Sequence, residues 1–167
     1  TERMQRKGIT MLLIDITLPV TPEMVQSARH PETKTPEGHI GTHFDVMDRE
    51  FPLAYTKRPG IAFDVRGVLE REIERSDIDL SLIPSGGFVA LYSGFIEREA
   101  YGSETYRKAH PQLSYRLIEA LVSQGTSIIG IDFAGIRRGK EHTPADQFLA
   151  DRGVFIVENL CFLGDVL

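Results

Sequence analysis

The segment His39-Ile40-Gly41-Thr42-His43-Phe44-Asp45 holds three side chains of the kinds that bind transition metals. Two imidazoles and one carboxylate suit a divalent ion such as zinc. Asp45 is two residues beyond His43, so both lie on one face if the chain is extended there. Gly41 permits the tight turn that their convergence requires. The spacing predicts a metal site of His39, His43 and Asp45, and the alternative is a polar loop with two incidental histidines.

Another carboxylate ends an apolar run near the end of the sequence. Glu158 follows Phe155-Ile156-Val157. Burying a carboxylate is costly unless it is paired or bound to a metal. Glu158 is therefore a candidate for the same chemistry, and the alternative is a strand-end residue that faces solvent.

Apolar runs predict the strands that position these groups. They lie at residues 11–17, 60–69, 88–92, 127–132 and 154–157. The runs at 11–17, 88–92 and 127–132 indicate buried strands, because few polar residues interrupt them.

Two helices are predicted between these strands. Residues 113–122 have helical spacing, with Ser114 as N-cap and Gly125 as the stop. The second helix takes Thr143 as N-cap and Pro144 at its first position. About five strands and two or three helices, with a helix leading through glycine into a strand, indicate an α/β fold.

Composition excludes several classes of protein. The 167 residues are predicted to form a single domain, 1–167. A net charge of −5 argues against nucleic-acid binding. A membrane-spanning helix needs about 18 consecutive apolar residues, and no apolar run in the sequence approaches that length. The polar N-terminus does not resemble a signal peptide, and the single Cys161 fits a reducing compartment, so we expect a cytoplasmic protein.

In their order along the chain, these segments resemble the cyclase family of metal-dependent hydrolases, which includes kynurenine formamidases and isatin hydrolases. Residues 39–45 are similar to the start of the family's HxGTHxDxPxH motif. Further similarities lie at residues 13–19, 89–95, 110–114, 129–132 and 157–160. The resemblance implies a swivelling β/β/α fold, a homodimer or larger homo-oligomer, and one or two divalent metals, zinc or manganese.

The resemblance also implies roles for single residues. The metal ligands it indicates are His39, His43, Asp45 and Glu158. The family's last motif histidine, thought to act in catalysis, is Arg49 here, and another family ligand histidine is Asp146. Asp146 either binds metal or completes a helix cap. Arg49 stays protonated and cannot act as a base, but it can bind a substrate carboxylate.

His142 lies just before the predicted second helix and can supply one of the missing imidazoles. Its expected role is catalytic, as proton shuttle, or that of a substitute metal ligand; the alternative is a solvated loop residue. Glu141 and Asp146 are the other candidate bases. His30 and His110 adjoin prolines and are interpreted as structural.

The function expected from the sequence is hydrolysis of an amide or cyclic amide carbon–nitrogen bond in a small-molecule substrate. A metal lowers the pKa of bound water to about 7. A nearby base collects the proton of this water and returns it to the departing nitrogen. The alternative is a non-catalytic protein that binds a small molecule or a metal and retains the fold.

Overall fold

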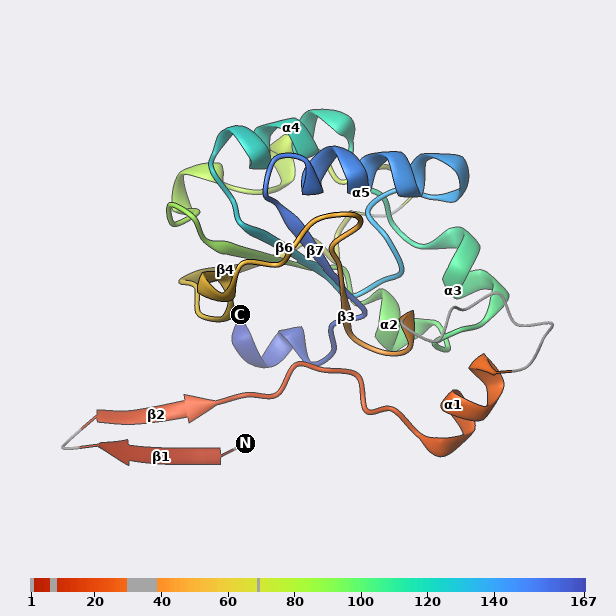
Figure 1. Ribbon diagram of the computed structural model, residues 1–167, viewed down its shortest axis with the longest axis horizontal. Helices are drawn as coiled ribbons and strands as arrows, with labels where there is room; N and C mark the ends of the chain where they lie inside the picture. The colour runs from red at the N-terminus through yellow and green to blue at the C-terminus, as the bar shows by residue number, and fades with distance from the viewer. Residues whose placement is uncertain (1, 7–8, 30–38, 69) are drawn as a thin grey trace.

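A five-stranded mixed sheet forms the centre of the computed structural model, which describes residues 2–6, 9–29, 39–68 and 70–167 (Figure 1). The strand order is β3-β7-β6-β5-β4. The strands are β3 His43–Asp45, β4 Gly60–Asp64, β5 Phe88–Tyr92, β6 Ile128–Ile131 and β7 Phe155–Glu158. Strands β4 to β7 are parallel, and β3 joins the edge of β7 in the antiparallel direction. The predicted α/β class is confirmed.

Both predicted helices are present, as α4 (Tyr115–Ser123) and α5 (His142–Ala150). Ser114 caps α4 as expected, because its Oγ accepts a hydrogen bond from the backbone N–H of Leu117. The described residues also form three shorter helices, α1 (Pro22–Ala28), α2 (Phe95–Arg98) and α3 (Glu104–Ala109).

The predicted start of α5 is wrong by two residues. The helix begins at His142, its N-cap position is Glu141, and Thr143 makes no capping hydrogen bond. A 3-10 turn over Gly139–Glu141 leads directly into α5. The chain is therefore already coiled before Thr143, and no side-chain cap is needed there.

The prediction of a buried strand over residues 11–17 is also wrong. Among the described residues, strand β2 (Ile9–Leu13) pairs only with β1 (Glu2–Arg6), in an antiparallel arrangement that extends away from the main sheet (Figure 1). Leu12 and Leu13 remain 54% and 40% exposed. The following residues cross one face of the sheet instead, where Cys161 N donates to Ile16 O at 2.8 Å. An apolar run records hydrophobicity and does not specify which strand it will pair with.

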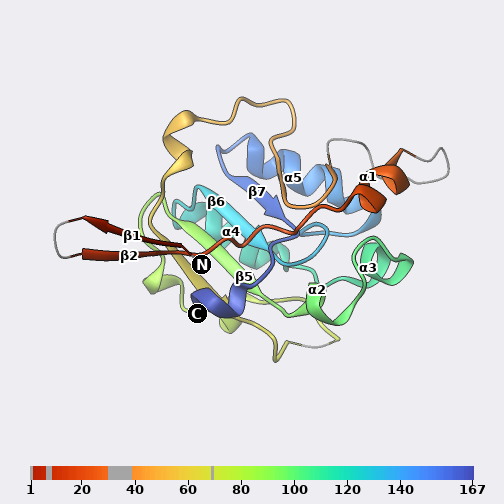
Figure 2. The ribbon, with the colours of Figure 1, turned by 90° about the horizontal axis from the view of Figure 1, so that it is seen from below.

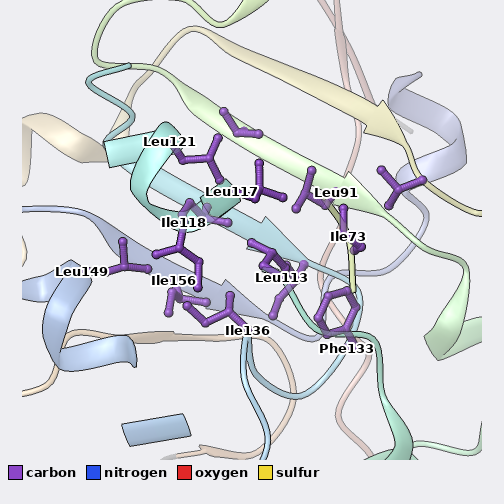
Figure 3. Packing of buried hydrophobic residues seen from close by; sticks show 14 of the residues in the cluster. Ile73, Leu91, Leu113, Leu117, Ile118, Leu121, Phe133, Ile136, Leu149 and Ile156 are labelled. Carbon is purple, nitrogen blue, oxygen red and sulfur yellow. The ribbon is translucent and has the colours of Figure 1, made fainter. Parts of the chain in front are cut away.

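Two apolar clusters cover the faces of the sheet. Helices α4 and α5 pack on one face, and Figure 3 shows Leu117, Ile118 and Leu149 meeting Leu91 and Ile156 there. On the opposite face, the N-terminal segment and the chain end lie over the strands (Figure 2). That smaller cluster contains Ala90, Tyr92, Ile128, Val157, Leu160 and Leu163. No helix in the described ranges has the length and hydropathy of a membrane span.

Leu117→Ala should lower the free energy of unfolding by about 2–5 kcal/mol, because Leu117 is 0% exposed and its truncation leaves a cavity. Leu53→Ala is the matched control, since Leu53 is 84% exposed, and should change stability by about 0.5 kcal/mol or less. Urea unfolding measures both. Equal effects of the two substitutions would contradict the packing described for α4.

Candidate metal centre

The pairing of β3 with β7 brings together residues that are far apart in the sequence. In the antiparallel register, His43 lies directly opposite Glu158. Asp45 is two residues further along the extended β3 and so shares a face with His43, as predicted. Gly41, at φ 72°, makes the turn before β3 that a side chain would strain.

The donor atoms of these residues lie at short distances from one another. Asp45 Oδ1 is 3.2 Å from His39 Nε2 and 3.6 Å from His43 Nε2. His43 Nε2 is also 3.6 Å from Glu158 Oε2. Two ligands bound about 2.1 Å from one tetrahedral metal lie about 3.4 Å apart. The spacing of these atoms is therefore that of a metal shell.

Helix α5 adds a second group of donors beside the first. His142 Nε2 is 3.2 Å from Asp146 Oδ2 and 4.0 Å from Glu158 Oε1. Asp45, His142 and Asp146 each have a ligand atom within 4.8 Å of the other two, as do His39, His43 and Asp45. Asp45 thus belongs to both groups. One cavity of about 730 Å³ is lined by His39, His43, Asp45, His142, Asp146 and Glu158.

The burial of this cluster indicates the kind of ligand it needs. Asp146 is 1% exposed and Glu158 is 5% exposed. Within the described chain, His43 Nε2, both oxygens of Asp146 and Glu158 Oε1 are buried without a hydrogen-bond partner. The nearby imidazoles are close to these carboxylates but lack hydrogen-bond geometry. Burying polar atoms without partners costs free energy. A divalent metal would bind these nitrogen and oxygen atoms as ligands and so satisfy them together.

Electrostatics support the same assignment. Burial, followed by the charge of Asp45, raises the pKa of Asp146 to about 8. Burial and the charges of Asp45 and Asp146 raise the pKa of Glu158 well above its ordinary value. Burial and neighbouring His43 lower the pKa of His39, which favours its neutral, ligating form. The residues therefore fit a cation. Glu158 does not face solvent and Asp146 does not cap α5, so both of those alternatives are wrong.

Two imidazoles are oriented by backbone carbonyls. His43 Nδ1 lies 2.9 Å from the carbonyl oxygen of Gly41, and His142 Nδ1 lies 3.2 Å from that of Arg137. A carbonyl only accepts, so each Nδ1 donates and each Nε2 keeps its lone pair for the site. This arrangement is typical of histidines that bind metals.

Asn159, which the sequence analysis missed, fastens the predicted metal-binding segment to β7. Its amide Nδ2 donates to Gly41 O at 2.9 Å, and its Oδ1 accepts from Tyr106 at 2.7 Å. The backbone oxygen of Asn159 accepts from Thr42 Oγ1 at 2.6 Å. Tyr101 completes the attachment, because its hydroxyl oxygen accepts from Gly41 N at 2.8 Å. Only the position of Asn159 beside Glu158 hinted at this role.

Gly135 was also missed, and it leaves space for His142. Its φ is 107°, and a Cβ atom there would lie 2.3 Å from His142 Nδ1. Only glycine fits this combination of backbone angle and close approach.

Two predicted functional residues lie elsewhere. Arg49 pairs with Asp151, its Nε donating to Oδ1 at 3.1 Å. Glu141 accepts from Arg137 Nε at 2.9 Å. Neither Arg49 nor Glu141 is among the described residues that line the cavity. Substrate binding by Arg49 stays a prediction that this geometry does not favour. His30 lies outside the described residues.

Comparison with known proteins supplies the family. A family model described as putative cyclase matches residues 14–137, a range that includes His39, His43 and Asp45. The chain belongs to the cyclase family. The predicted resemblance is thus confirmed, although a search of curated proteins gave no match.

Solved structures share the fold of this cyclase-family protein. A potential metal-dependent hydrolase with cyclase activity is 26% identical, with 92% of this chain covering 84% of that one and a TM-score of 0.67. A predicted metal-dependent hydrolase from Bacillus stearothermophilus is 24% identical, covering 88% and 81%, with a TM-score of 0.64. Isatin hydrolase A from Labrenzia aggregata is 20% identical, covering 75% and 61%, with a TM-score of 0.62. The cyclase fold expected from the sequence is confirmed.

His43→Ala and Glu158→Gln should each remove most of the bound divalent metal while the protein remains folded, because each supplies a donor to the cluster. Metal content is measured on protein purified without chelator, and circular dichroism checks the fold. Glu104→Gln is the control, since that exposed carboxylate pairs with Lys108 on the outside of α3. Wild-type metal content in both site variants would exclude these residues as ligands.

Gly135→Ala should displace the His142 ring and reproduce the effect of His142→Ala on metal content, since the added Cβ occupies the position of the ring. Gly125→Ala is the control: Gly125 also has a positive φ, 79°, but a Cβ there meets nothing within 4 Å. Metal titration of the three variants measures the effect. If Gly135→Ala behaved like Gly125→Ala while His142→Ala differed, Gly135 would have no part in placing His142.

Proposed function

We propose that this cyclase-family protein is a metal-dependent hydrolase that cleaves an amide or cyclic amide carbon–nitrogen bond. The observation that carries the proposal is a set of buried side-chain nitrogen and oxygen atoms without hydrogen-bond partners. They belong to His43, Asp146 and Glu158 and line a cavity of about 730 Å³. That volume is in the range of small-molecule sites. Similar structures described as metal-dependent hydrolases and an isatin hydrolase support the same class of reaction.

The residues that would hold the metal form two groups. His39, His43 and Asp45 make the first, and Asp45 also belongs to the second with His142 and Asp146. Glu158 lies between them, with one oxygen near His43 and the other near His142. A bound divalent ion supplies a Lewis acid and an activated water. Mixed imidazole and carboxylate ligands suit both zinc and manganese.

His142 is the candidate for moving the proton. Its Nδ1 is held by Arg137 O, so Nε2 points toward Asp146 and Glu158. As a shuttle, Nε2 takes a proton from the attacking water and returns it to the departing nitrogen. As a substitute ligand, Nε2 would bind the metal directly. The Nδ1 atoms of His142 and His43 both face a backbone carbonyl, and this shared orientation supports the ligand role. Glu141 is the weaker candidate base, because Arg137 holds its carboxylate.

An ion pair between Arg49 and Asp45 or Glu158 would favour the non-catalytic alternative. The guanidinium of Arg49 would then occupy the place of the metal. Arg49 pairs instead with Asp151 and Asp48. No specific observation therefore favours a binding protein over an enzyme. A small-molecule substrate, a cytoplasmic location and a homodimer or larger homo-oligomer remain part of the proposal.

The test combines metal analysis with a screen of amides, cyclic imides and lactones on protein loaded with zinc or manganese. Hydrolysis should require metal and should disappear with chelator. His142→Ala should lower turnover by about 100-fold or more if His142 is the base. Unchanged metal content would then identify a shuttle, and reduced content a ligand.

Glu104→Gln is the control, since that exposed carboxylate pairs with Lys108 away from the cavity; its turnover should stay close to that of the wild type. Metal-independent turnover, or no turnover on any amide or cyclic imide, would contradict the proposed function. Unchanged turnover and metal content in His142→Ala would remove both roles of His142.

A further inference from the structure

Among the described residues, two arginines line the cavity that holds the metal cluster, and carboxylates neutralise only one of them. Arg137 is 6% exposed, and its guanidinium donates to the carboxylates of Glu72 and Glu141. Arg107, on α3, is exposed and has no carboxylate of the described chain within ion-pair distance. Its positive charge is therefore available to a molecule that enters the cavity.

The backbone of the cavity wall holds the Arg107 side chain in place. Its Nη1 donates a hydrogen bond to Gly102 O. Gly102 has no side chain, so it lines the cavity with its backbone alone, and the guanidinium lies against that part of the wall. The other guanidinium N–H groups donate to no described residue. Glu104, on the same helix, pairs with Lys108 instead.

A guanidinium of this kind is complementary to a carboxylate. Arginine stays protonated at physiological pH and presents a fork of N–H groups that matches the two oxygens of a carboxylate. The net charge of −5 and the carboxylates of the metal cluster repel an anion from the site, so a local cation is needed to attract one. The sequence analysis gave this chemistry to Arg49, which pairs with Asp151 outside the cavity.

We propose that Arg107 is a substrate-binding residue that selects substrates carrying a carboxylate. If the proposed function is right, these substrates are amides that bear a carboxylate in addition to the carbon–nitrogen bond that is cleaved. The recognition of the carboxylate itself rests on Arg107 and the cavity, and the identity of the cleaved bond rests on the proposed function.

Arg137 does not offer the same site, because Glu72, Glu141 and the backbone oxygen of Leu113 already occupy its guanidinium. The exposure of Arg107 adds a second property. Salt screens the attraction between exposed charges, so binding of a carboxylate by Arg107 weakens as the ionic strength rises.

The test compares dicarboxylates with monocarboxylates of the same chain length: succinate with butyrate, glutarate with pentanoate, and adipate with hexanoate. Binding to the zinc-loaded protein is measured by NMR titration, which needs no turnover. When one carboxylate binds the metal, the second is free to reach Arg107, and the series varies the separation of the two groups.

Three variants are compared with the wild type. Arg107→Gln removes the charge, and Arg107→Lys keeps the charge but loses the planar fork. Arg116→Gln is the matched control, because Arg116 is also exposed, lies on α4 outside the cavity, and its loss changes the net charge by the same amount. Metal content is measured for all of them.

The wild type should bind at least one dicarboxylate about 5-fold or more tightly than its monocarboxylate, and less so at high salt. Arg107→Gln should lose this preference, Arg107→Lys should keep part of it and Arg116→Gln all of it, with metal content unchanged. No preference at any chain length would overturn the proposal. A preference that survives in Arg107→Gln would also overturn it, since the second carboxylate would then bind elsewhere.

The same measurements separate this proposal from the proposed function. A preference that is lost in Arg107→Gln, in a protein that hydrolyses no amide or cyclic imide, would support the role of Arg107 while refuting the proposed reaction. Hydrolysis of neutral amides without any preference for dicarboxylates would refute the role of Arg107 and leave the proposed reaction intact.

Discussion

Three carboxylates buried at the end of β7 are the constraint on which the rest of this site depends. Asp45, Asp146 and Glu158 are 8%, 1% and 5% exposed, and their charges repel one another. Such a cluster is unfavourable unless protons or a cation neutralise it. A divalent metal would offset two of these three negative charges and keep the carboxylates ionised, so metal binding and local stability would be coupled.

The scaffold places this cluster where parallel sheets commonly hold ligands. The cavity lies beyond the carboxyl end of β7, where its last residue, Glu158, meets the antiparallel strand β3. Asn159 and Tyr101 then fasten the turn at Gly41, so the imidazole of His43 is held by backbone and side chains together. Precise placement of ligands depends on such supporting contacts as much as on the ligands themselves.

The departures of this chain from the family pattern form a consistent set. Asp146 stands where the resemblance implies a histidine, and α5 brings His142 one turn away to the same cluster. The geometry thus restores an imidazole beside the carboxylate that replaced one. Arg49 forms an ion pair with Asp151 and not with Asp45, Asp146 or Glu158. The space that His142 needs is provided by Gly135.

The sequence by itself determined the local features. The spacing of His43 and Asp45 placed both on one face of β3, Gly41 made the turn, and Ser114 capped α4, because each depends on residues close in the chain. Only the tertiary structure decided that His142 joins the metal cluster while Arg49 does not, since that follows from the strand order and from the packing of α5. The same holds for His110: its neighbour Pro111 indicated a turn, but the contact with Phe133 and the position beside the cavity arise from segments far apart in the sequence. Sequence spacing specifies a face or a turn, whereas register and helix packing decide which faces meet.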